Sequence, residues 1–247
     1  MITNMNYHTN TTLVIKRANK VFPIIEPILA KYGVPDDFKY LAVIESSLVN
    51  AVSPAGARGV WQFMPATAKE KGMEVSEHVD ERYHLEKSTE AACRYLLAAK
   101  EKFGSWTLTA ASYNGGIGGI KNKMEEQQVD NYYDLLLTEE TSRYVFRILA
   151  LKEIMKNADK YGFSIPKEAL YYQIPTKKIV VDSSITNLAQ FAKSQGVNYK
   201  ILKLHNPWLR DKMLMNTAGK KYEIEIPTAG YTTVSYTHLT LPTNREV

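Results

Sequence analysis

Apolar residues recur at spacings of three and four through most of residues 13–161. This is the period of an α-helix that buries one face. The alternation typical of strands appears only after residue 175. The pattern therefore predicts a mainly α-helical domain, followed by a small α+β module.

Glycine, proline and capping residues divide the helical part into segments. We expect a first helix over residues 13–31, broken or kinked at Pro23 and Pro27. Three further expected helices are 36–49, 65–71 closed by Gly72, and 88–104 capped by Ser88. Ser105 can cap the next helix, which runs into "ASYNGGIGG". The last expected helix runs from Thr138 to about Tyr161 and has one apolar stripe, formed by Tyr144, Ile148, Leu151 and Met155.

The pattern of apolar and polar residues changes near Pro175. The segments "KKIVVD" and "KYEIEIP" read as strands, and "SSITNLAQFAKSQG" and "NYKILKLHNP" between them read as helices, which gives a βααβ unit. We therefore expect a domain over residues 1–162, a linker over 163–176, a module over 177–228 and a tail over 229–247. The tail has no partner strand. From Val234 onward it resembles translated adapter sequence, so we treat it as non-native or disordered.

Composition excludes several classes of function. Apolar residues make up 45% of the chain and the formal net charge is +5, without the dense basic stripe that nucleic-acid binding needs. A single cysteine, Cys93, excludes a disulfide within the chain, and the five histidines lack metal-ligand spacing, so we expect no metal and no cofactor. No apolar run is long enough to span a bilayer, and the first residues lack a signal-peptide pattern. Either the protein is cytosolic or an export signal lies upstream.

Glu45 is the residue with the most unusual surroundings. Its helical neighbours at three and four residues are Leu41, Ala42, Leu48 and Val49, none of which can form an ion pair with it. Removal from water without a nearby cation raises the pKa of a carboxyl group, and a general acid needs such a pKa. The alternative is a buried structural glutamate satisfied by backbone donors or by a distant arginine.

Two further segments have the composition of a ligand-binding surface. "GARGVWQFMP" combines a glycine turn with Gln62 and Met64, and "SYNGG" places Tyr113 and Asn114 before glycines. Each residue has an ordinary alternative, because Tyr113 and Trp61 could be core residues and Asn114 a helix C-cap.

In this order and spacing, four blocks resemble the catalytic domain of the soluble lytic transglycosylases, a lysozyme-like fold, and within them the branch of membrane-bound lytic murein transglycosylase D. The blocks are "YLAVIESSL", "SPAGARGVWQFMP", "SYNGG" and "EETSRYV", and the resemblance spans about Phe22 to Tyr161. The chain departs from the family pattern at Ser112 and in the glycines that follow Asn114, where we expect a loop.

The resemblance implies that Glu45 is the catalytic acid and base for cleavage of the β-1,4 bond between N-acetylmuramic acid and N-acetylglucosamine, with a 1,6-anhydro product and no water consumed. Ordinary glycosidases use two carboxylates. Asp80, Glu81 and Glu86 lie in segments that we interpret as solvated, so none of them is expected to be a second acid. The resemblance also assigns substrate-binding residues, namely Ser53, Gln62, Met64, Tyr113, Asn114 and Tyr144.

The C-terminal unit resembles a divergent LysM domain, a module that binds glycans containing N-acetylglucosamine. Trp208 could stack on a sugar or serve only in packing. The expected partner is therefore the peptidoglycan glycan strand, bound by a monomer in the periplasm or cell envelope, with no nucleic acid and no membrane span in this chain. A lysozyme-type hydrolytic muramidase and a non-catalytic peptidoglycan-binding protein remain as alternatives.

Overall fold

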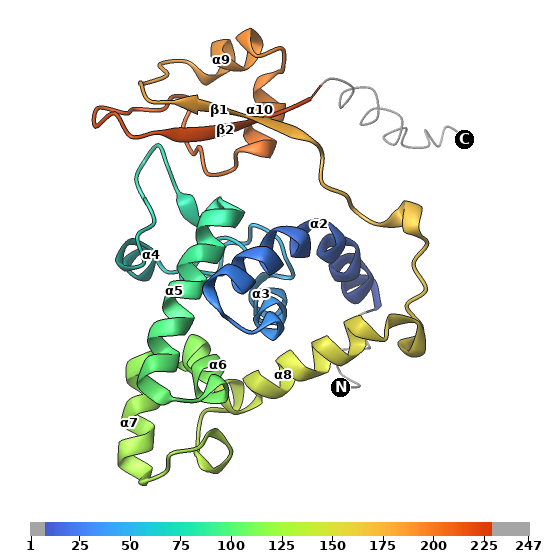
Figure 1. The fold of residues 1–247 in the computed structure, drawn as a ribbon, viewed down its shortest axis with the longest axis vertical. Helices are drawn as coiled ribbons and strands as arrows, with labels where there is room; N and C mark the ends of the chain where they lie inside the picture. Colours follow the sequence, from blue (N-terminus) through green and yellow to red (C-terminus); the bar gives the residue numbers. More distant parts are fainter. Residues whose placement is uncertain (1–7, 229–247) are drawn as a thin grey trace, which may run out of the picture. The chain divides into compact units, whose positions relative to one another are not determined.

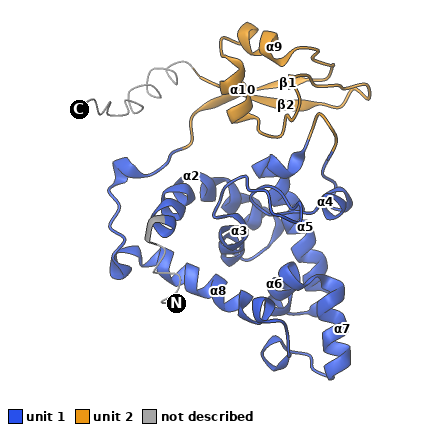
Figure 2. Ribbon diagram, turned by 180° about the vertical axis from the view of Figure 1, so that it is seen from behind, with its two compact units in different colours: residues 1–75, 80–172 blue, residues 76–79, 173–247 orange. Residues whose placement is uncertain are grey.

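The computed structural model describes residues 8–228. Within this range the chain forms two compact units (Figure 2). Unit 1 comprises residues 8–75 and 80–172, and unit 2 comprises residues 76–79 and 173–228. The domain boundaries expected from the sequence stay predictions.

Unit 1 is built from α-helices and short 3₁₀ helices. They are α2 (His8–Tyr32), η1 (Asp36–Phe38), α3 (Lys39–Ser46), α4 (Pro65–Glu70), η2 (Glu81–Tyr83), α5 (Leu85–Phe103), α6 (Trp106–Gly115), α7 (Ile117–Gln127), η3 (Tyr132–Asp134), α8 (Glu139–Lys156), η4 (Ala158–Tyr161) and η5 (Lys167–Ala169). Unit 2 holds β1 (Thr176–Val181), α9 (Leu188–Ser194), α10 (Tyr199–His205) and β2 (Tyr222–Pro227). The expected fold class, a mainly helical unit followed by a βααβ unit, is confirmed.

Helix α2 continues through Pro23 and Pro27, so the expected break is wrong. Each proline removes one backbone donor and costs about 3 kcal/mol in a helix interior. Ile25 and Leu29 are fully buried on the same face, and α2 packs against α5 and α3. This burial of apolar surface compensates for the lost hydrogen bonds.

The helix that carries Glu45 is shorter than the sequence predicts. Helix α3 ends at Ser46, because Ser47 and Leu48 have positive φ values of 53° and 60°. Leu48 is buried from this turn rather than from a helix, and Val49 is 36% exposed. The apolar surface on the helix beside Glu45 therefore comes from Leu41 and Ala42.

Two other helix boundaries differ from expectation. Ser88 lies inside α5, which begins at Leu85, whereas Ser105 caps α6 as predicted by accepting from the backbone N–H of Leu108. The glycine-rich segment is not a loop, because α7 begins at Ile117 directly after Gly116. Gly116 has φ +74°, which separates the two helices, and Ile120 anchors α7 in the core.

Helix α3 lies between α2 and α8, against both of them (Figure 1). Trp61 is fully buried in the same core and donates its indole N–H to Thr89 Oγ1 at 2.9 Å. The predicted apolar stripe of α8 is confirmed, since Tyr144, Ile148, Leu151 and Met155 all belong to or pack against this core.

Unit 2 is organised around the antiparallel pair β1–β2, with Ile179 opposite Ile224. Trp208 is 4% exposed and stacks on Tyr222, with ring centroids 5.7 Å apart. Of the two alternatives for Trp208, the structure favours packing. The tail for which we expect a non-native or disordered segment, residues 229–247, lies outside the described residues.

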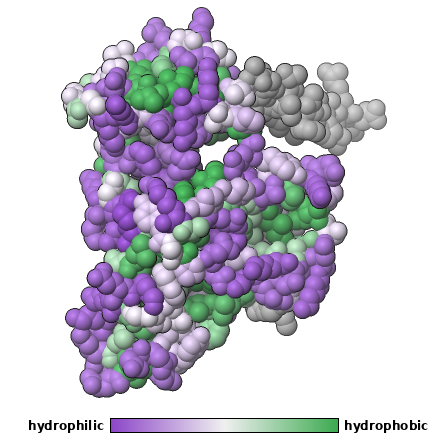
Figure 3. Space-filling view, in the orientation of Figure 1, coloured by the Kyte–Doolittle hydropathy of each residue, from purple (hydrophilic) through white to green (hydrophobic). Residues whose placement is uncertain are grey.

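Hydrophilic residues cover most of the face seen in Figure 3. Among residues 8–228, no helix is both long enough and apolar enough to span a bilayer.

Cys93 is fully buried in unit 1, and burial raises the pKa of its thiol to about 12.

Candidate active site

Glu45 is the penultimate residue of α3 and is half-buried. Burial is the largest influence on its carboxyl group, and it raises the pKa above the usual value of 4.5. A hydrogen bond from Tyr144 and the charge of Arg147 lower this pKa, while the charge of Glu140 raises it. The net direction is upward, so the carboxyl group retains its proton to higher pH than an exposed glutamate does.

Helix α8 brings Tyr144 to this carboxyl group. The Tyr144 hydroxyl donates a short hydrogen bond to Glu45 Oε1, across 99 positions of sequence. The tyrosine is 1% exposed, and burial together with the charge of Glu45 raises the pKa of its phenol well above the usual value. Tyr144 therefore remains a neutral donor that fixes one carboxyl oxygen of Glu45.

Tyr113 lies near Glu45, but its hydroxyl group donates to another acceptor. Its Oη donates to the Trp61 carbonyl at 2.8 Å, and its ring meets the edge of Tyr95 at 5.2 Å. Burial and then the charge of Glu45 raise the pKa of the Tyr113 phenol. Tyr113 thus ties α6 to the turn that contains Gln62.

Asn114 connects the end of α6 to the start of α8. Its Oδ1 accepts from the Thr141 hydroxyl at 2.8 Å, and its Nδ2 donates to Glu140 Oε1 at 3.2 Å. Both partners lie in the first turn of α8, one turn before Tyr144. Asn114 therefore helps to set the position of α8, the helix whose Tyr144 contacts Glu45.

Three predicted site residues lie on the segment between α3 and α4. Ser53 Oγ accepts from the backbone N–H of Ala57 at 3.0 Å, and Met64 is 42% exposed. Gln62 has φ +50°, and its Nε2 donates to the carbonyls of Ala51 and Gly59 at 3.1 Å and 2.7 Å. Both amide hydrogens of Gln62 are therefore used within the loop, which leaves its Oε1 as the group able to accept from a ligand.

A buried ion pair supports this loop. Arg82 and Asp80 are 3% and 2% exposed, and they meet through two hydrogen bonds of 2.9 Å and 2.8 Å. The remaining Arg82 nitrogen, Nη1, donates to the carbonyls of Gly56 and Phe63 at 3.2 Å and 3.1 Å. The guanidinium group therefore fixes both sides of the turn that presents Gln62.

The interpretation of Asp80 and Glu81 as solvated residues is wrong, because each is 2% exposed. Glu81 forms an ion pair with Lys87 and accepts from the backbone N–H of Glu74 at 2.7 Å. Arg82, two positions after Asp80, was the sequence signal for a buried pair. Unlike Glu45, both carboxylates form an ion pair with a cationic side chain.

Sequence reasoning missed two charged residues on α8. Glu140 precedes Tyr144 by four positions and Arg147 follows it by three, so all three lie on one side of the helix. The charges of both act on Glu45. This spacing around Tyr144 was visible in the sequence, but its meaning depended on which side of α8 faces α3.

The Tyr144→Phe substitution should move the alkaline limb of the kcat/KM profile to higher pH. The lost hydrogen bond lowers the pKa of Glu45 in the wild-type protein, so its removal leaves the acid protonated to higher pH. We also expect kcat to fall about tenfold to a hundredfold, because Oε1 is no longer held in place. Rates measured from pH 4 to 9 test this, and an unshifted or lowered limb would contradict the assigned hydrogen bond.

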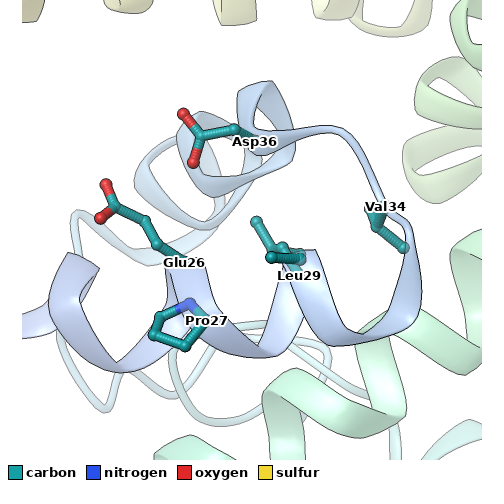
Figure 4. Close-up of a pocket in the computed structure, with 6 residues that line it drawn as sticks. Glu26, Pro27, Leu29, Val34 and Asp36 are labelled. Carbon is teal, nitrogen blue, oxygen red and sulfur yellow. The ribbon is translucent and has the colours of Figure 1, made fainter.

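Other candidate binding features lie away from this acid in the chain. A pocket of about 440 Å³ is lined by the second half of α2 and the turn after it, with Glu26 and Asp36 at its edge (Figure 4). Lys39 bonds to both carboxylates, at 2.7 Å and 2.6 Å. None of the predicted site residues lines this pocket. Within residues 8–228, no group of three or more His, Cys, Asp or Glu side chains is placed to hold a metal ion.

Comparisons with known proteins agree with the division into two units. Residues 22–135 match the family model of the transglycosylase SLT domain. Residues 177–230 match the model of the soluble lytic transglycosylase C-terminal LysM-like domain. The first match includes Glu45 and all the other predicted site residues except Tyr144, which follows it in α8.

Among curated proteins, the chain is similar to membrane-bound lytic murein transglycosylase D of Escherichia coli (strain K12) and of E. coli O6:H1, with 29% identity over 225 residues. The alignment covers 89% of this chain, and the chain spans 48% of the length of these relatives. A solved structure of an inactive mutant of lytic transglycosylase Slt from Pseudomonas aeruginosa matches 61% of the chain and 26% of its own, with 18% identity and a TM-score of 0.43. On the two model matches, residues 22–135 belong to the transglycosylase SLT domain family and residues 177–230 to the soluble lytic transglycosylase C-terminal LysM-like domain family.

Proposed function

We propose that this protein is a peptidoglycan lytic transglycosylase. In this proposal it cleaves the β-1,4 bond between N-acetylmuramic acid and N-acetylglucosamine and leaves a 1,6-anhydro end. The observation that carries the proposal is the setting of Glu45, a half-buried carboxyl group with a raised pKa and a buried phenol bonded to one oxygen. Membership of the SLT domain family supports the substrate class.

The proposed chemistry uses Glu45 twice. Its carboxyl proton passes to the glycosidic oxygen as the bond to C1 of the muramyl residue breaks. The resulting carboxylate then takes the proton of the muramyl C6 hydroxyl while O6 bonds to C1. Glu45 is protonated again at the end and no water enters the product, so one carboxyl group suffices. Tyr144 keeps Oε1 in place through both steps.

A hydrolytic muramidase is the second candidate function. It is favoured by Glu140, a second carboxylate whose charge acts on Glu45. Hydrolysis by glycosidases normally requires a second carboxylate that activates water or stabilises the oxocarbenium ion. Glu140 is exposed and its charge acts on Glu45. Its Oε1 already accepts from Asn114, which gives Glu140 a structural role in the lyase proposal.

For unit 2 we propose binding to the glycan of the same polymer. A groove of about 360 Å³ lies between the segment after β1 and α9, and its lining includes Ser184, Asn187 and Gln190. Ile185 pairs with Leu214 through two backbone hydrogen bonds of 2.8 Å, which steadies one wall of this groove. A second binding site on one polymeric substrate raises the effective concentration of the catalytic unit.

We place the protein in the periplasm or cell envelope and expect it to act as a monomer.

Digestion of purified sacculi followed by mass spectrometry tests this function. A lyase releases muropeptides that are lighter by one water than hydrolysis products. Products with reducing ends alone would replace the lyase proposal with the muramidase. Binding to sacculi without any released fragment would identify a non-catalytic peptidoglycan-binding protein.

A further inference from the structure

Arg147 is a half-buried arginine on the side of α8 that faces the acid. It follows Tyr144 by three positions, and Tyr144 is the residue that contacts Glu45. Among the residues that the structure describes, Arg147 forms no ion pair and no side-chain hydrogen bond, although its charge acts on Glu45. Its guanidinium group therefore has all five N–H donors available for a ligand.

The neighbouring cations of α8 are arranged differently. Arg143 pairs with Glu139 at 2.7 Å, and Lys152 pairs with Asp37 at 2.6 Å. Both of these partners are acidic residues on the surface. Arg147 lies between them along the helix and is left without such a partner in the described part of the chain, next to the group that performs the chemistry.

We propose that Arg147 binds a carboxylate of the peptide stem carried by the muramyl residue at the cleavage point. This inference rests on the proposed function, because it names the part of that substrate which Arg147 recognises. The sugar backbone of such a glycan is uncharged, and its anionic groups are the carboxylates of the stem. A planar guanidinium group binds a carboxylate through two parallel hydrogen bonds.

Glu140 gives this recognition a direction. Glu140 lies four positions before Tyr144 and Arg147 lies three positions after it. The two opposite charges therefore flank Tyr144, the residue that contacts Glu45, along α8. A stem carboxylate is attracted to the Arg147 side and repelled from the Glu140 side. The charges therefore favour one orientation of the strand over Glu45, with the stem-bearing sugar toward Arg147.

Binding measured in a Glu45→Gln background tests the inference without turnover. The two probes are glycan oligosaccharides with free stem carboxylates and the same oligosaccharides with those carboxylates converted to methylamides. We expect the Glu45→Gln protein to bind the free-carboxylate probe about tenfold more tightly. Adding Arg147→Gln should remove this preference, and adding Arg147→Lys should retain only part of it, because lysine keeps the charge but cannot form the two parallel hydrogen bonds.

Arg143→Gln is the matched control, since it removes the same charge one turn away and should leave the preference unchanged. The inference is overturned if the two probes bind equally to the Glu45→Gln protein, or if the preference survives Arg147→Gln. Cleavage of sacculi by the wild-type protein is measured separately. A wild-type protein that cleaves nothing while the Arg147-dependent preference persists would overturn the proposed function and leave the carboxylate site standing.

Discussion

The Glu45→Gln substitution should reduce the rate of glycan cleavage about 10³-fold or more. Glutamine keeps the shape of the side chain but can neither give a proton to the glycosidic oxygen nor accept one from the C6 hydroxyl, and general acid–base catalysis is typically worth about 10²- to 10⁴-fold at each step. Among the described residues, the two fully buried carboxylates, Asp80 and Glu81, are engaged with cations and cannot take over this role. The measurement is the initial release of soluble muropeptides from sacculi.

The stability of the same variant provides the control for folding. The raised pKa of Glu45 means that the folded protein holds this proton more tightly than the unfolded chain does. The stabilising contribution is therefore complete below the unfolded pKa and is lost as the pH rises through the folded pKa. At pH 7 to 8 the Glu45→Gln protein should therefore melt above the wild type, because glutamine leaves no charge to be buried.

This advantage in melting temperature should disappear as the pH falls below the unfolded pKa of glutamate, about 4.3, where the wild-type carboxyl group is protonated in both states. Two outcomes would count against the assignment. Retention of more than a tenth of the wild-type cleavage rate would remove Glu45 from the chemistry. A melting temperature below that of the wild type at pH 7 would mean that the ionised carboxylate stabilises the fold.

The Gly59→Ala substitution should destabilise unit 1 by about 3 kcal/mol or more. Gly59 has φ +83°, and a Cβ at this position would lie 1.8 Å from the Arg82 carbonyl oxygen. The left-handed backbone alone costs about 1–2 kcal/mol for alanine, and displacing the backbone of a buried segment adds a cost of similar size. Urea unfolding measures the loss, and cleavage should fall with it because Gly59 also accepts from the Gln62 amide.

Gly56→Ala is the matched control for this prediction. Gly56 lies in the same loop with φ +88°, but a Cβ there would meet no atom within 4 Å. It should therefore show only the backbone cost of about 1–2 kcal/mol. Equal destabilisation by the two alanines would show that the contact with Arg82 contributes nothing and that only the φ angle matters.

Much of the fold could be predicted because its signals are local. The period of apolar residues identified the helices and the βααβ unit, and capping residues such as Ser105 fixed particular ends. The errors arose where packing overrides local preference. The burial of Ile25 and Leu29 keeps α2 intact through two prolines, and Ile120 holds α7 in place despite its glycines.

The sequence by itself singled out Glu45 as the candidate acid, because its helical neighbours Leu41 and Ala42 are apolar and offer it no ion-pair partner. Only the tertiary structure decided what acts on that acid. Tyr144 reaches Glu45 across 99 positions, Asp80 and Arg82 form a buried pair beside the loop that contains Gln62, and Arg147 forms no ion pair within residues 8–228 while its charge acts on Glu45. These contacts depend on how α8 and the loop before α4 pack against α3, and spacing along the chain carries no information about the distance between separate elements.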